Sequence, residues 1–186
     1  KNGYPEYFAK VLNSVNWIGL DIWINEEKLD LAKAVKIENF QRELDMMNGI
    51  LKRSFICSLH NGARIKVMAK RFVSMDQEEL GLLTYSIQAL NNDVNLKLIS
   101  YLDADIKNKD SNYDEKFWDE VSQEALHSEM KVVAVTKKTN FAVAAKAHTR
   151  LDLDGIIVAE AADMTIKSKY AAQGFHVSLP SGSTCT

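Results

Sequence analysis

The sequence predicts a mostly β protein built as an antiparallel sandwich or barrel. Two observations predict this class. Short segments alternate apolar with polar residues, and turn residues separate these segments at regular intervals. The clearest turns are Asn48-Gly49 and Asn61-Gly62, because Asn-Gly readily adopts the positive φ angles of a type I′ hairpin. Asn25-Glu26 and Asp154-Gly155 mark further turns between alternating segments.

The alternating segments define the expected strands and the side of each that faces the core. In chain order the strands are expected within 16–24, 53–59, 64–70, 94–101, 141–150 and 156–167. Because side chains alternate across a strand, one set of apolar residues should face inwards. The expected core residues are Ile18, Leu20, Ile22, Phe55, Cys57, Ile65, Val67, Leu96 and Leu98.

The segment 114–128 departs from this alternation. Its apolar residues follow helical spacing, so the segment is expected to be either a helix or an irregular excursion from the strand pattern. These residues include Phe117, Trp118, Val121, Ala125 and Leu126. No repeat or linker interrupts the chain, whereas 1–12 and 177–186 do not look like complete ends. We therefore expect 1–186 to be a single β-sandwich domain excised from a larger enzyme and incomplete at both ends.

Composition and charge exclude several classes of function. The 186 residues carry a net charge of −2, which does not favour nucleic acid or an anionic membrane surface as a partner. No apolar run reaches the roughly 20 residues needed to cross a bilayer. The two cysteines, Cys57 and Cys185, are too few for a disulfide framework and lack metal-ligand spacing. Packed thiols of this kind are typical of a reducing compartment, so we expect a cytoplasmic protein.

Five motifs carry a resemblance to a known family. In this order, the motifs resemble those of the N-terminal domain of family 65 glycoside hydrolases, which includes the maltose, kojibiose and trehalose phosphorylases. They lie at 12–17, 44–55, 71–75, 88–91 and 102–108. Proline or glycine is usual in the family at three positions where this chain has Val15, Ala89 and Ala104.

The resemblance implies a fold and a role for the chain. The implied fold is an antiparallel β-supersandwich of the galactose mutarotase type, packed on an (α/α)6 barrel. That barrel holds the general-acid glutamate, and inorganic phosphate is the co-substrate of the inverting reaction, without a cofactor. The motif that carries the glutamate is not found in this sequence, so no catalytic residue is predicted here. The expected partners are the enzyme's own barrel and, in a homodimer, a second copy.

Two groups of residues are candidate binding sites. Trp17 and Trp23 share one side of a predicted strand and could stack on a sugar, although packing against a neighbouring sheet or the barrel explains them better. A second predicted strand carries Lys146, His148 and Arg150 on one side. These residues could hold phosphate, although a solvated stripe of charges is the commoner case.

Acidic loops do not predict a metal site. Calcium needs a tight loop with a glycine and a bidentate glutamate, which neither loop has. The loop residues are Asp103, Asp105, Asp110, Asp114, Asp152 and Asp154.

The sequence leaves three hypotheses for the function. The favoured function is a non-catalytic sandwich domain of a disaccharide phosphorylase or hydrolase. The second is an autonomous carbohydrate-binding module that uses Trp17 and Trp23. The third is a sugar epimerase of the mutarotase type, which needs a histidine acid and a glutamate base in one pocket. No such pair can be recognised in the sequence.

Overall fold

The computed structural model describes residues 11–109, 114–159 and 161–186, whose strands form three antiparallel sheets. The five-stranded sheet contains, in spatial order, β13 (Asp163–Lys167), β14 (Tyr170–Leu179), β7 (Val94–Asp103), β1 (Asn16–Ile24) and β2 (Glu27–Lys28). The three-stranded sheet contains β10 (Ala142–His148), β9 (Glu129–Thr136) and β8 (Trp118–Ala125). The seven-stranded sheet contains β12 (Ile156–Ala159), β11 (Leu151–Leu153), β15 (Thr184–Cys185), β6 (Gly81–Ala89), β5 (Arg64–Val73), β4 (Ile50–Ser58) and β3 (Lys36–Asp45).

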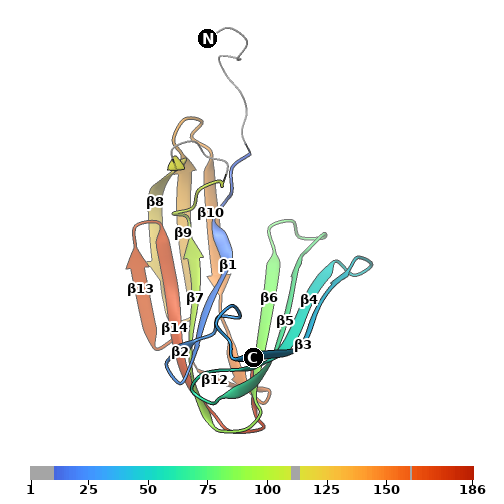
Figure 1. Ribbon diagram of the computed structural model, residues 1–186. Helices are drawn as coiled ribbons and strands as arrows, with labels where there is room; N and C mark the ends of the chain where they lie inside the picture. Colours follow the sequence, from blue (N-terminus) through green and yellow to red (C-terminus); the bar gives the residue numbers. More distant parts are fainter. Residues whose placement is uncertain (1–10, 110–113, 160) are drawn as a thin grey trace.

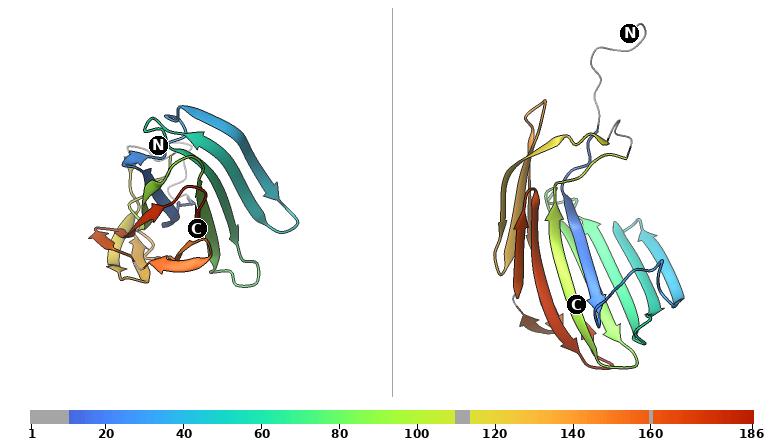
Figure 2. Two further views of the ribbon diagram at one scale, coloured as in Figure 1. Left: turned by 90° about the horizontal axis from the view of Figure 1, so that it is seen from below. Right: turned by 60° about the vertical axis from the view of Figure 1, so that its left-hand side comes forward.

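The sheets are arranged as a two-layer sandwich (Figures 1 and 2). The five-stranded sheet is one layer, and both other sheets pack against its inner side. On β7, Leu96 and Leu98 belong to the core shared with the seven-stranded sheet. Leu102, which has the same parity on that strand, belongs to the core shared with the three-stranded sheet. The two cores therefore lie end to end along one face of the five-stranded sheet.

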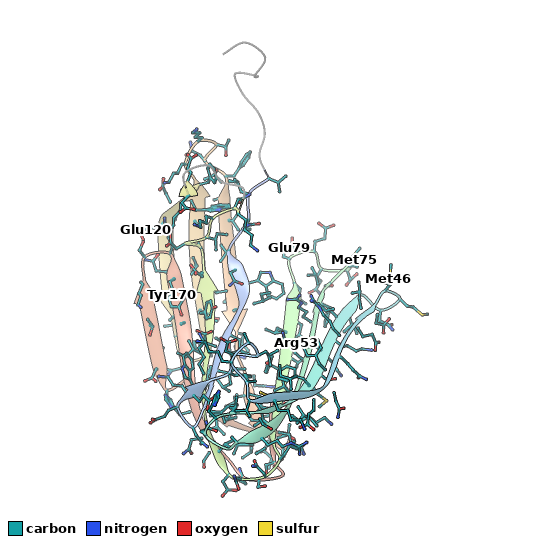
Figure 3. All side chains as sticks on the ribbon, viewed as in Figure 1. Met46, Arg53, Met75, Glu79, Glu120 and Tyr170 are labelled. Atoms are coloured by element: carbon teal, nitrogen blue, oxygen red, sulfur yellow. The ribbon has the colours of Figure 1, made fainter. Side chains whose placement is uncertain are left out.

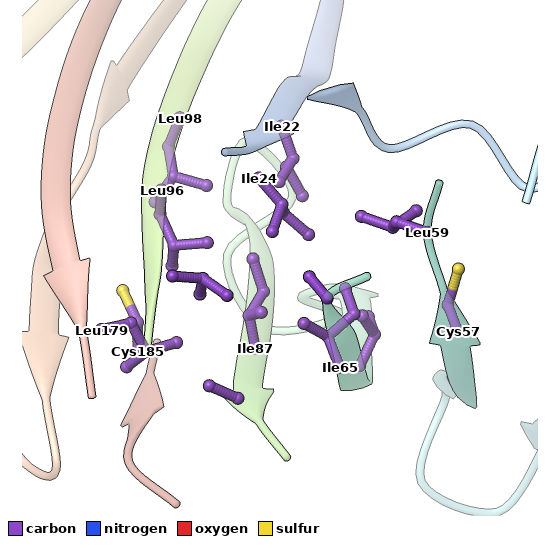
Figure 4. Packing of buried hydrophobic residues seen from close by; sticks show 14 of the residues in the cluster. Ile22, Ile24, Cys57, Leu59, Ile65, Ile87, Leu96, Leu98, Leu179 and Cys185 are labelled. Atoms are coloured by element: carbon purple, nitrogen blue, oxygen red, sulfur yellow. The ribbon is translucent and has the colours of Figure 1, made fainter. Parts of the chain in front are cut away.

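The larger core is formed where β1, β7 and β14 face the seven-stranded sheet (Figure 4). Ile24, Ile65 and Cys57 are fully buried in it, and Phe55 and Phe175 are nearly so. Burial of one such large apolar side chain stabilises the fold by about 1.5–3 kcal/mol. The alternating apolar sides predicted from the sequence therefore supply most of this core.

The smaller core packs β8 and β9 on the far end of β7 and β14. Met130 and Val132 of β9 are buried against Leu102. Trp118 is also buried, and its indole Nε1 donates a hydrogen bond to the Asn13 carbonyl oxygen at 2.8 Å. This bond satisfies the polar atom of a buried ring.

Most of the predicted strands are confirmed, and the mostly β antiparallel class is confirmed. The first strand has the predicted bounds, Asn16–Ile24. The segment 156–167 instead divides into β12 and β13, which belong to different sheets. The expectation of an incomplete N-terminal end concerns residues that lie mainly outside those described.

Ile18 is the wrong member of the predicted core set. Its side chain is 37% exposed, because no strand of the facing layer covers this end of β1 closely. Leu20 is half-buried and packs on the edge of the larger core. The seven other predicted core residues are buried.

The helical alternative for 114–128 is also wrong. Trp118–Ala125 forms β8, with a register shift between Glu120 and Ser122. A β-bulge inserts one residue and reverses the alternation beyond it. Trp118 and Ala125 therefore both face the core although seven positions separate them, a spacing that imitates a helix. Within the described residues, no helix is long and apolar enough to cross a membrane.

Candidate functional site

A cleft of about 220 Å³ lies between β1 and the inner face of β3–β6. The ribbons of the two layers diverge there, and Figure 3 shows Arg53 on the sheet that faces β1. The cleft is lined by Ile18, Leu20, Arg42, Leu51, Arg53, Ala69, Lys70, Arg71, Leu83 and Tyr85.

The cleft exists because the two layers have different widths at this end. β1 pairs with β7 along most of its length, but on its other edge β2 pairs only with Trp23 and Ile24. No further described strand continues the five-stranded sheet over β3–β5. The inner side chains of these strands are therefore left facing an opening instead of a second sheet.

Three arginines and Lys70 give the cleft its positive charge. Arg42 on β3 and Arg53 on β4 are direct cross-strand partners. Arg71 is on β5, opposite Leu51 of β4. The guanidinium of Arg53 lies 5.7 Å from the ring centre of Phe55, within the range of a cation–π contact. Among the described residues, no carboxylate lies within ion-pair distance of Arg42, Arg53 or Arg71.

Tyr85 forms part of the cleft wall beside Arg53. Burial raises the pKa of Tyr85, and the nearby Arg53 charge and hydrogen bond act in the opposite direction. The phenol is therefore neutral at physiological pH and available as a donor or acceptor. The cleft thus combines a polar hydroxyl and cations with the apolar side chains of Leu20 and Leu51.

The cleft residues favour binding over acid–base catalysis. None of the residues that line it is a histidine, an aspartate or a glutamate. Protonation of a glycosidic oxygen requires a positioned acid, which this lining does not supply. The arginines were missed in the sequence, although their pattern is visible there: Arg53 lies between Leu51 and Phe55 on the apolar side of an alternating strand.

Trp17 and Trp23 lie on different faces, contrary to the shared face that alternation predicts. The register of β1 shifts between Asn16 and Gly19, and the Trp17 ring lies over Gly81 of β6, at the cleft side. The Trp23 ring is on the outer side, with the Lys28 and Lys97 ammonium groups 5.2 and 5.6 Å from its centre. The two rings do not form one stacking platform; sugar binding by either stays a prediction.

The predicted anion group lies on the solvent side of the three-stranded sheet. Lys146 and His148 are exposed on β10, and Arg150 is exposed just beyond its end. The Lys146 ammonium pairs with Glu129 at 2.7 Å, which neutralises the Lys146 charge. Phosphate binding here also stays a prediction.

The acidic loops are tied by lysines and turns. Asp105 pairs with Lys116 and Lys169, and Asp114 pairs with Lys107. Asp110 lies outside the described residues. Five carboxyl groups have a lowered pKa, and hydrogen bonds are the main cause in each. They are Glu38, Asp45, Asp105, Asp114 and Asp154.

Comparison with known proteins identifies the family. The chain matches the model of the glycosyl hydrolase family 65 N-terminal domain over residues 1–186 and belongs to that family. It is 40% identical to maltose phosphorylase of Bacillus subtilis (strain 168) over 125 residues, which are 67% of this chain and 16% of that protein. It is 25% identical to alpha,alpha-trehalose phosphorylase of Thermoanaerobacter brockii over 172 residues, covering 84% of this chain and 21% of that protein.

A solved structure supports the fold. A protein described as a kojibiose phosphorylase from the human microbiome superposes with a TM-score of 0.79 at 24% identity, covering 94% of this chain and 22% of that one. The resemblance seen in the sequence motifs is thus confirmed. The chain corresponds to the N-terminal domain of these phosphorylases and spans only about a fifth of their length.

Proposed function

We propose that the chain is the non-catalytic N-terminal β-sandwich domain of an inverting disaccharide phosphorylase or hydrolase of the maltose, kojibiose or trehalose type. The observation that carries this proposal is the family match over the whole chain, together with relatives that are phosphorylases. The lining of the cleft, which has no carboxylic acid, agrees with a supporting role.

In this proposal the chemistry belongs to an (α/α)6 catalytic domain of the same enzyme. A carboxylic acid there protonates the glycosidic oxygen while inorganic phosphate attacks the anomeric carbon from the opposite face. Phosphate is itself the nucleophile, so a single acid is sufficient and no cofactor is needed. The sandwich domain supports that barrel and, in a homodimer, can contribute to the contact between copies.

The proposal also places the enzyme in the cytoplasm. Cys57 and Cys185 are both free and buried. Free thiols persist in a reducing compartment, whereas secreted domains commonly oxidise their cysteines in pairs. A cytoplasmic phosphorylase would also have inorganic phosphate available as its co-substrate.

The test is an assay of the complete gene product beside chain 1–186. With maltose, trehalose or kojibiose and inorganic phosphate, the complete product should act on at least one sugar. A phosphorylase releases β-glucose 1-phosphate, whereas a hydrolase releases glucose without consuming phosphate. Chain 1–186 should release neither glucose nor sugar phosphate. The proposal fails if the complete product acts on none of these sugars, or if chain 1–186 turns one over and loses that activity through a single carboxylate substitution.

A further inference from the structure

We propose that the cleft is the docking surface for an extended segment of the same polypeptide from outside residues 1–186. This segment pairs with the free edge of β1 and presents carboxylate side chains to Arg42, Arg53 and Arg71. The inference rests on the proposed function, because it takes the chain to be part of a longer enzyme.

The first support is the backbone edge of β1. On that edge β2 pairs only with Trp23 and Ile24, and the Leu29 amide donates to the Ile22 carbonyl oxygen at 2.8 Å. Backbone groups alternate between the two edges of a strand, so the Leu20 amide and carbonyl point to this edge, where they face no described strand. An unpaired edge presents backbone donors and acceptors to any extended segment. Apolar side chains accompany this edge, since Ile18 and Leu20 line the cleft.

The second support is the uncovered face opposite that edge. Phe40 is 50% exposed and Leu44 is 62% exposed on β3, whereas Cys57 and Ile65, toward the other end of the same sheet, are fully buried. Facing sheets in a sandwich pack about 10 Å apart. A strand added to β1 would continue that layer over β3–β5 and cover these side chains. An exposed apolar patch of this kind marks a surface that binds a partner segment.

The third support is charge. Guanidinium groups that are partly buried normally pair with carboxylates, often through two parallel hydrogen bonds. Arg53 and Arg71 are half-buried, and together with Arg42 they lie in a cleft whose lining contains no carboxylate. Side chains of a strand point alternately to its two faces. The occupant therefore carries carboxylate and apolar side chains on the face that enters the cleft.

The same charges favour a segment of the enzyme over a second copy of this chain. Antiparallel pairing of two β1 edges would bring two copies of the arginine cluster together, and like charges at close range repel. A segment in the same polypeptide binds at a high effective concentration. The relatives contain abundant further sequence, because the matches cover only 16% and 21% of their lengths.

The experiment compares hydrogen exchange in the complete gene product and in chain 1–186. The Leu20 amide, which points to the same edge of β1 as the Ile22 carbonyl, should exchange at least ten times more slowly in the complete product. Arg53→Met should lower the melting temperature of the complete product by several degrees more than that of chain 1–186. The matched control is Arg64→Met, which removes an arginine on β5 that is already paired with Glu38 at 3.2 Å. Its effect should be equal in the two proteins.

The outcomes separate this inference from the proposed function. An equal exchange rate of the Leu20 amide in the two proteins overturns the docking inference, as does a gene that encodes no further polypeptide. Protection in chain 1–186 that grows with its concentration assigns the edge to a second copy and also overturns it. A complete product that protects this edge but acts on no disaccharide refutes the proposed function alone. Phosphorolysis without protection refutes the docking alone.

Discussion

Replacing Gly19 with alanine places a methyl group inside the ring of Tyr101. A Cβ built on Gly19 lies 2.3, 2.4 and 2.6 Å from three Tyr101 ring atoms, whereas unstrained contacts begin near 3.4 Å. The ring cannot move freely, because it stacks on Tyr170 with centres 5.5 Å apart. Gly19→Ala must therefore shift either the β1 backbone or this aromatic pair.

The structure gives the magnitude. Overpacking of a well-packed site costs about 1–3 kcal/mol. Loss of a stacked aromatic pair costs about 0.5–1.5 kcal/mol. We expect Gly19→Ala to lower the free energy of unfolding by about 2 kcal/mol, which corresponds to roughly 4–8 °C in melting temperature for a protein of this size.

Urea unfolding of the variant and of a double-mutant cycle checks this reasoning. Tyr101→Ala removes the obstacle, so Gly19→Ala should cost at least about 1 kcal/mol less in that background. Gly174→Ala is a control in the same sheet. Its Cβ meets Asp163, whose nearest atom is the side-chain Cβ at 3.1 Å, so its cost should be smaller. A Gly19→Ala protein as stable as the unmodified one would refute the proposed rigidity of the Tyr101 ring.

Three further outcomes follow from the same structure. The five carboxyl groups with lowered pKa stabilise the fold above their ordinary values of 3.8 and 4.5, and this stabilisation is lost as the pH falls through them. The urea concentration at the unfolding midpoint should therefore stay constant between about pH 7 and pH 5 and decrease at pH values below about 4. A midpoint independent of pH would contradict this. Burial raises the pKa of the Cys57 thiol and raises that of Cys185 to about 11. A thiol reagent at pH 8 should therefore label neither cysteine until urea is added. Rapid labelling of the native protein would contradict this. Trp23→Ala should cost well below the ~3–5 kcal/mol of a fully buried tryptophan, and maltose should give no saturable fluorescence change in the parent chain. Sub-millimolar quenching that this substitution abolishes would restore the binding-module hypothesis.

The strands were predictable where each residue follows the alternation. Asn16–Ile24 has the bounds that its pattern predicts, and Asn25 and Glu26 have φ angles of 47° and 69°, as a tight turn requires. Two of the errors lie beside a register shift. The shift near Gly19 separates Trp17 from Trp23, and the shift near Ser122 gives β8 its helix-like spacing. A bulge changes parity without a distinctive residue type, so the sequence does not reveal it.

The cleft could not be predicted for a different reason. The apolar side of β4 is visible in the sequence, and Arg53 is visible as a cation on that side. Whether this cation is buried or exposed depends on which strand stands opposite, and Ile18 and Leu20 come from a distant part of the chain. Alternation reports the face of a strand but contains nothing about the width of the facing layer.

The two layers also differ in the order of their strands, which has a consequence for folding kinetics. From β3 to β6 each strand pairs with the next one in the sequence, so these contacts close short loops. The other layer pairs Leu20 with Ser100, which are far apart in the chain. Local pairings form sooner, because less loop entropy is lost. We expect the β3–β6 meander to acquire amide protection before β1 docks on β7, and pulsed hydrogen exchange during refolding would reveal the opposite order if β1 were protected first.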